Sequence, residues 1–187
     1  MAMKKRLTFV MVTLLLSIAA PTQGKNLEPA LEDTLAIATT RNSIVSKGIR
    51  AYKNHNYSRA VCLLKTFLNT RRVIANPLEK EGLNYLALAY QQVGKQTLAT
   101  ETIDRAISLF DNSTLELANL ENTAGIIADR QNKKIIANQH WEKARQLYSA
   151  NHLWDNWAKI TIKIAQNHLE LGNIAIYKQL LQELENY

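Results

Sequence analysis

The sequence predicts an all-α protein built from four antiparallel helical hairpins. Four stretches of the 187-residue chain fit one template. Within them, apolar residues return every three or four positions, which is the spacing of one helix face. No segment shows the alternating apolar and polar pattern, rich in Val, Ile and Thr, that is typical of a strand. Because a single hairpin cannot bury its own apolar face, we expect the hairpins to stack.

Each stretch contains a two-residue step on a first helix, then a turn, then an apolar ladder on a second helix. The steps are Lys47-Gly48, Leu86-Ala87, Ala124-Gly125 and Ile164-Ala165. The turns are His55-Asn56, Gly94-Lys95, Asn132-Lys133 and Gly172-Asn173. The ladders start at Ala60, Ala99, Ala137 and Tyr177, which are 39, 38 and 40 residues apart. They continue with Leu64 and Phe67, Ile103 and Ala106, Trp141 and Ala144, and Leu181 and Leu184.

The same periodicity predicts the helix boundaries. We expect eight helices over residues 41–187, with breaks near residues 55, 76, 94, 112, 132, 150 and 172. A further short helix, opened by Pro29 and carrying Leu31, Leu35 and Ile37, is expected to cover the exposed face of the first pair.

This pattern resembles the tetratricopeptide repeat, whose signature runs from a Leu-Gly step through a tyrosine to alanines and an aromatic residue. Residues 80–113 fit best and keep Leu83, Leu86, Tyr90, Gly94, Ala99, Ile103 and Ala106 in the family's spacing. The repeats here exceed the roughly 34 residues of the family. Pro77 alone represents the family's late proline, and Tyr177 replaces a small alanine. The resemblance implies a right-handed α-solenoid over residues 41–187, with a divergent terminal cap.

Residues 1–24 have the pattern of a secretory signal peptide. Lys4, Lys5 and Arg6 precede the uncharged run from Leu7 to Ala20, which is shorter than the roughly 20 residues of a membrane span. Cleavage is expected after Gly24, with Ala19 as the second choice. Residues 25–40 are then an N-terminal segment that holds the short capping helix. The pattern predicts a periplasmic or secreted protein; the alternative is an uncleaved anchor with the array facing the periplasm.

Composition argues against several classes of function. Cys62 is the single cysteine, so no internal disulfide forms, and its place between Ala60 and Leu64 predicts a small buried hydrophobe. The net charge of +7 falls to +4 once Lys4, Lys5 and Arg6 are removed. The remaining basic residues are scattered and lack a recognition motif, so no nucleic-acid partner is expected.

No residues are spaced for catalysis or for metal binding. The histidines His55, His140, His152 and His168 have no His-Glu-x-x-His spacing and no Cys-x-x-Cys partner. Phosphate-binding loops and nucleophile elbows are also missing from the sequence. We therefore predict no enzyme activity, no cofactor and no metal. His168 is expected on the packing face, and Trp154 and Trp157 are expected to seal the junction of the last two hairpins.

The resemblance to the tetratricopeptide repeat also implies a binding groove lined by the first helices. Carried over position by position, the groove residues are Asn84, Leu88, Gln91, Asn119, Asn122, Ile126, Asp129, Lys159, Ile162, Gln166 and Leu169. The Lys and Asn set with which some members hold a partner's terminal carboxylate is not reproduced. Asn84, Asn122 and Gln166 come from successive first helices and predict an amide ladder for a peptide backbone.

These observations favour a non-enzymatic scaffold or assembly factor of the cell envelope, which binds a protein or peptide partner in the groove. One alternative is an inner-membrane-anchored assembly factor with the same array. Another is a helical sensor module for a small ligand, which would require a closed apolar pocket between the hairpins.

Overall fold

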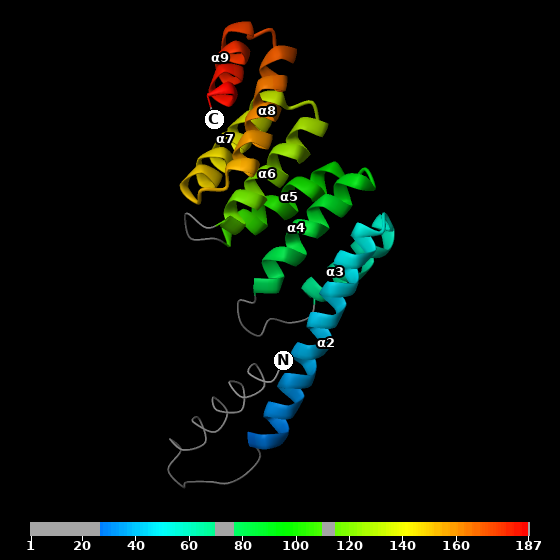
Figure 1. Cartoon of the computed structure of the whole chain (residues 1–187). Helices are drawn as coiled ribbons and strands as arrows, with labels where there is room; N and C mark the ends of the chain where they lie inside the picture. The colour runs from blue at the N-terminus through cyan, green and yellow to red at the C-terminus, as the bar shows by residue number, and fades with distance from the viewer. Residues whose placement is uncertain (1–26, 70–76, 110–114, 187) are drawn as a thin grey trace. The chain divides into compact units, whose positions relative to one another are not determined.

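The computed structural model describes residues 27–69, 77–109 and 115–186, and these residues form eight α-helices and no strand (Figure 1). The helices pair in chain order: α2 (Leu27–Lys53) with α3 (Tyr57–Asn69), α4 (Pro77–Gln92) with α5 (Gln96–Ser108), α6 (Leu115–Arg130) with α7 (Lys134–Ala150), and α8 (Trp154–Glu170) with α9 (Ile174–Glu185). The all-α helical repeat predicted from the sequence is therefore confirmed. The predicted signal peptide lies outside the described residues.

The turns inside the four pairs share one backbone geometry. His55, Gly94, Asn132 and Gly172 occupy the same position, and each has a positive φ, between 59° and 77°. Each following residue donates its N–H to a carbonyl five residues earlier, as in Lys95 to Tyr90 at 2.8 Å. This closure satisfies carbonyl groups at the end of the first helix. The turn markers read from the sequence are thus confirmed.

Within a pair, the step on the first helix makes room for the ladder on the second. A Cβ built on Gly48 would lie 2.7 Å from the Leu64 side chain, and one built on Gly125 would lie 2.3 Å from the Trp141 ring. The small ladder residues Ala60, Ala99 and Ala137 are fully buried. The helices therefore cross closely where the sequence places small residues.

Between pairs, the first helix of the next repeat packs on the second helix of the previous one, so that α3 contacts α4, α5 contacts α6, and α7 contacts α8. At the first of these junctions, the ring of Phe67 approaches the position of a Gly82 Cβ to 3.1 Å. A glycine thus faces a large ladder residue. Stacking buries the apolar faces that single hairpins leave open.

The structure differs from the sequence prediction at the beginning of the array. In place of a separate short helix followed by the first repeat helix, α2 runs without a break from Leu27 to Lys53. Pro29 lies in its first turn, where the missing N–H costs nothing. No glycine or proline follows until Gly48, so the sequence contains no stop signal near residue 40. The structure does not describe the side chains of Leu31, Leu35 and Ile37, so the predicted covering of the first pair stays a prediction.

Three predictions of burial are wrong. Cys62 is exposed; it lies two positions from both Ala60 and Leu64, which places it on the other side of the helix. Leu181 is 36% exposed, and Leu180 is buried instead. Trp154 is 38% exposed, so only Trp157 packs into the core that the last two pairs share.

Candidate protein-binding face

The predicted groove residues lie on the first helices α4, α6 and α8. Those on α4 are half-buried, as are Asn122, Ile126 and Asp129 on α6, whereas Asn119 is exposed. On α8, the predicted residues Lys159, Ile162, Gln166 and Leu169 are all exposed. The structure therefore presents these side chains at or near the surface, and their partners decide what the surface offers to a ligand.

Polar and aromatic contacts join each first helix to the next. Tyr52 of α2 stacks edge-on against Tyr85 of α4, with ring centroids 5.4 Å apart. Arg130 of α6 donates to Oε1 of Gln91 on α4 at 2.5 Å. Lys163 of α8 donates to Oδ1 of Asn122 on α6 at 3.1 Å. We call the residues of these contacts, together with charged and amide neighbours on the same helices, the first-helix face: Tyr52, Lys53, Tyr85, Gln91, Asn122, Asp129, Arg130, Lys159, Lys163 and Gln166.

The three amides of the predicted ladder have different surroundings. Asn84 Oδ1 is buried and has no hydrogen-bond partner in the described part of the chain. Asn122 Oδ1 is occupied by Lys163, and Gln166 is exposed. Asn122 Oδ1 has a partner and Asn84 Oδ1 has none because the residue just before the step of the following repeat differs. Lys163 reaches back to Asn122, whereas the equivalent Thr123 donates to Asn119 of its own helix at 3.0 Å.

The cations of the first-helix face contact neutral groups. Arg130 donates to an amide, Lys163 donates to an amide and lies 5.5 Å above the ring of Trp141, and Lys53 lies 5.9 Å above the ring of Tyr85. Burial lowers the pKa of Lys163, and the nearby Asp129 opposes this shift. The fold therefore holds an ammonium group where burial disfavours its charge.

The carboxylates beside these cations already have a partner. Lys134 lies 2.7 Å from Asp129 and 2.7 Å from Glu170, so one ammonium bridges α6 and α8. The hydrogen bonds to Asp129 and Glu170 raise the pKa of Lys134. Among the described residues, no carboxylate pairs directly with Lys53, Arg130 or Lys163. An anion that reaches the first-helix face therefore meets cations that form no direct ion pair with another described residue.

Sequence reasoning missed Tyr52, Tyr85, Arg130 and Lys163. Tyr52 occupies in the first repeat the position that Gln91 has in the second, five residues after the first step residue. Tyr85 and Lys163 share the position just before the step. Aligning all four repeats by their steps would have placed Tyr52, Tyr85 and Lys163 beside the predicted positions. The contact partners could not have been found in this way.

Other polar groups pack inside the array. The carboxylate of Glu121 on α6 is 5% exposed, and His140 Nδ1 on α7 lies 2.6 Å from it. In the residues the structure describes, no three His, Cys, Asp or Glu side chains gather in a way that could hold a metal ion. None of the described helices is both long and apolar enough to cross a membrane.

Two surface pockets lie away from the first-helix face. One, of about 540 Å³, is lined by residues of α7, the end of α8 and the α8–α9 turn, including Ile135, His168 and Leu171. The other, of about 450 Å³, lies among Arg145, Trp157 and Glu183. Both are open to solvent, so neither is the closed apolar pocket that a small-ligand sensor would require.

No protein-family model matches the sequence, and no curated protein matches it. Solved structures match the fold. MamA matches with a TM-score of 0.62 at 16% identity, over 83% of this chain and 84% of that chain. BtubC from P. vanneervenii matches with a TM-score of 0.50 at 13% identity, over 85% of this chain and 84% of that chain.

A third structure is the Rap conjugation gene regulator of the plasmid pLS20 in complex with the Phr* peptide. It matches with a TM-score of 0.64 at 13% identity, over 90% of this chain and 48% of that chain. The present chain thus spans about half the length of that regulator. MamA and Rap are tetratricopeptide-like repeat proteins, and the likeness shows that this chain has the same kind of fold.

Proposed function

We propose that this protein is a non-enzymatic interaction scaffold or assembly factor of the cell envelope, which binds an acidic segment of a partner protein through the first-helix face. The observation that carries the proposal is that the cations of this face contact neutral groups, while the nearby carboxylates are already paired. Arg130, Lys163 and Lys53 contact amides and rings, while Asp129 and Glu170 share Lys134. An acidic peptide therefore finds cations here without having to displace an existing ion pair.

The neutral groups of the face suit a peptide as well. The exposed amide of Gln166 both donates and accepts hydrogen bonds, as a peptide backbone requires. Tyr52 and Tyr85 offer rigid apolar area with a polar tip. Charge steers the encounter and fixes the register of a bound segment, while the amides and rings make short-range contacts. The Rap structure, which holds a peptide, supports the use of such a fold for peptide binding.

The envelope location rests on the N-terminal sequence. A basic start followed by a short uncharged apolar run is typical of a secretory signal. We therefore place the array in the periplasm or outside the cell, after cleavage near Gly24. An uncleaved anchor would leave the same array beside the membrane, and mass spectrometry of the protein from its own envelope fraction distinguishes the two.

The test begins with isolation of the partner from the envelope fraction and its identification. Titration calorimetry then compares wild type with Lys159→Glu on α8 and with Lys65→Glu on α3. Both lysines are exposed on helices. Both substitutions replace a lysine with a glutamate, so they change the net charge by the same amount. We expect Lys159→Glu to weaken binding by about tenfold at low salt and by less at high salt, with Lys65→Glu near wild type. Weakening by Lys65→Glu alone would place the binding surface on the second helices.

A further inference from the structure

The outer side of the last hairpin exposes four large apolar residues, Ile162 and Leu169 of α8 and Ile174 and Leu181 of α9. They are 44%, 45%, 45% and 36% exposed. On each helix the two residues are seven positions apart, so they lie on one side of it. We call these four residues the end face.

In two of the three earlier repeats, each of the positions of Ile162 and Leu169 contacts the first helix of the following repeat. Among the equivalents of Ile162, two residues before the step, Val45 lies 3.1 Å from the Cβ position of Gly82 and Asn122 bonds Lys163. The third equivalent, Asn84, has no hydrogen-bond partner for its Oδ1 in the described residues. Among the equivalents of Leu169, Tyr52 meets the ring of Tyr85 edge-on and Gln91 accepts from Arg130. The third equivalent, Asp129, pairs with Lys134 of its own hairpin. On α8 these contacts have no counterpart among the described residues.

The positions on α9 show the same relation. The equivalent of Ile174 in the third repeat is Lys134, which pairs with Glu170 of the following first helix at 2.7 Å. The equivalent of Leu181 is Trp141, which is 3% exposed and lies under Lys163 of that helix. Each of the four end-face positions thus contacts the following first helix in at least one earlier repeat. An exposed apolar cluster at such positions indicates a binding surface.

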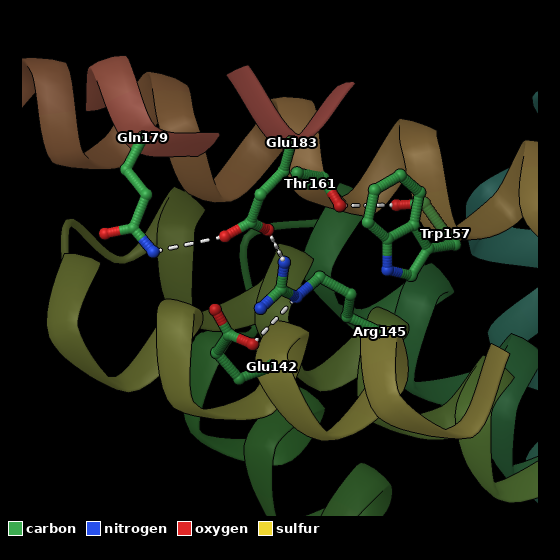
Figure 2. A network of polar contacts seen from close by, with 6 residues as sticks. All are labelled: Glu142, Arg145, Trp157, Thr161, Gln179 and Glu183. Carbon is green, nitrogen blue, oxygen red and sulfur yellow. Dashed lines mark hydrogen bonds and ion pairs between the residues drawn. The ribbon is translucent and has the colours of Figure 1, made fainter. Parts of the chain in front are cut away.

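The helix that carries half of this surface is held firmly. Arg145 of α7 lies between two carboxylates and donates to Glu142 at 2.9 Å and to Glu183 of α9 at 2.8 Å (Figure 2). Gln179 donates to the other oxygen of Glu183 at 3.2 Å. This network fixes the face of α9 that points toward α7. The opposite stripe, Ile174, Lys178, Leu181 and Glu185, is exposed along its whole length.

We propose that the end face binds the end face of a second copy of this chain, in a twofold-symmetric dimer in which the two α9 helices run antiparallel. The charges on the stripe are complementary to themselves. With the twofold axis beside Leu181, each Lys178 lies near Glu185 of the other copy, while the Leu181 side chains meet at the centre. Neither Lys178 nor Glu185 has an ion-pair partner among the described residues of its own chain. A twofold interface of this kind uses one patch twice and closes after two subunits.

The other end of the array does not offer an alternative surface for the second copy. In α4, α6 and α8, the first step residue and the residues four before it and three after it are buried. Among them, Gly82 lies against Phe67 and Asn167 donates to Asn138, each in the preceding repeat. On α2 these positions carry Ser43, Lys47 and Arg50, and all three are exposed. Packing α8 and α9 of one copy on α2 of the next would bury these polar side chains against isoleucine and leucine. The end-to-end dimer is therefore favoured over a head-to-tail chain.

Sedimentation velocity of the purified protein over a range of concentrations tests the dimer. We expect the wild type to associate to twice the monomer mass, and Lys178→Glu and Glu185→Lys each to weaken dimerisation by about tenfold or more, because like charges then face each other. The double variant with both substitutions should dimerise again, and a mixture of the two single variants should form a heterodimer. Lys65→Glu is the matched control and should behave as wild type.

Circular dichroism keeps this test separate from folding, since Lys178 and Glu185 are exposed and their substitution should leave the spectrum unchanged. A wild type that stays monomeric at about 100 μM overturns the proposal. So does a dimer that Lys178→Glu leaves intact, or a double variant that fails to recover.

Discussion

Replacement of Gly125 by alanine tests the closest contact between step and ladder. The new methyl carbon would lie 2.3 Å from both Cδ1 and Nε1 of Trp141, a side chain that is 3% exposed and donates to the carbonyl of Asn122 at 3.2 Å. Overpacking of a core costs about 1 to 3 kcal/mol. The gain from removing a helical glycine is about 1 kcal/mol. At the upper end of the overpacking range, the net loss of stability is about 2 kcal/mol, or a fall of about 4 to 8 °C in Tm.

The second repeat shows how the clash can be relieved. There the equivalent pair is Ala87 with Ile103, and both residues are buried. Trp141→Ile alone should leave a cavity beside Gly125 and cost about 2 to 4 kcal/mol, somewhat less than truncation of a buried Trp to Ala. In the double variant, the alanine methyl fills part of that cavity. We expect the double variant to be more stable than the sum of the single effects by about 1 to 2 kcal/mol.

Urea unfolding followed by circular dichroism measures all three variants, with Gly82→Ala as the control. A Cβ at Gly82 meets Phe67 and Val45 at 3.1 Å, so a small shift of either side chain relieves it, and the variant should stay close to wild type. If Gly125→Ala proves as stable as wild type, or if the single effects add within about 0.5 kcal/mol, the step does not pack on the ladder as described.

Three further variants test other parts of the array. Gly94 has a φ of 77° with no atom within 4 Å of a built Cβ, so Gly94→Ala should lower the free energy of unfolding by about 1 to 2 kcal/mol through backbone strain alone. An unchanged urea midpoint would contradict the turn geometry. Ala99→Trp should lower the Tm by more than Gln91→Trp does, because Ala99 is fully buried and Gln91 is half-buried; equal melting temperatures would show a wrong helix register. Arg145→Met removes the ion pair with Glu183, and because both side chains are partly exposed we expect α9 to lose about 0.5 to 1 kcal/mol of local stability. Amide hydrogen exchange in α9 should then be about two- to fivefold faster, and unchanged exchange would mean that other contacts hold α9.

Repeat spacing was enough to predict the pairs of helices and their turns. His55, Gly94, Asn132 and Gly172 are chemically different, yet all four adopt a positive φ because each stands at the same place in the template. Asn and His enter this region more readily than most residues, and glycine enters it freely. The helix boundaries followed from the same periodicity, except at α2, where no residue between Pro29 and Gly48 marks a break.

Burial and pairing depend on neighbours that a single repeat does not contain. Leu181 fits the ladder, and its equivalent Trp141 also lies against Lys163 of the following first helix, whereas no described helix packs on α9 from that side. Asn122 was expected as a free amide, whereas Lys163, 41 residues later, occupies it. Such contacts between repeats are set by which side chain is long enough to reach across, and spacing alone does not show this.

Photo-crosslinking in the cell envelope tests the proposed binding face most directly. A photoreactive residue is placed at Gln166 on α8 or, as the matched control, at Gln139 on α7, since both glutamines are exposed. We predict that the partner is captured from Gln166 and not from Gln139, and that Lys159→Glu reduces the capture. Capture from Gln139 with none from Gln166 would contradict binding at the first-helix face.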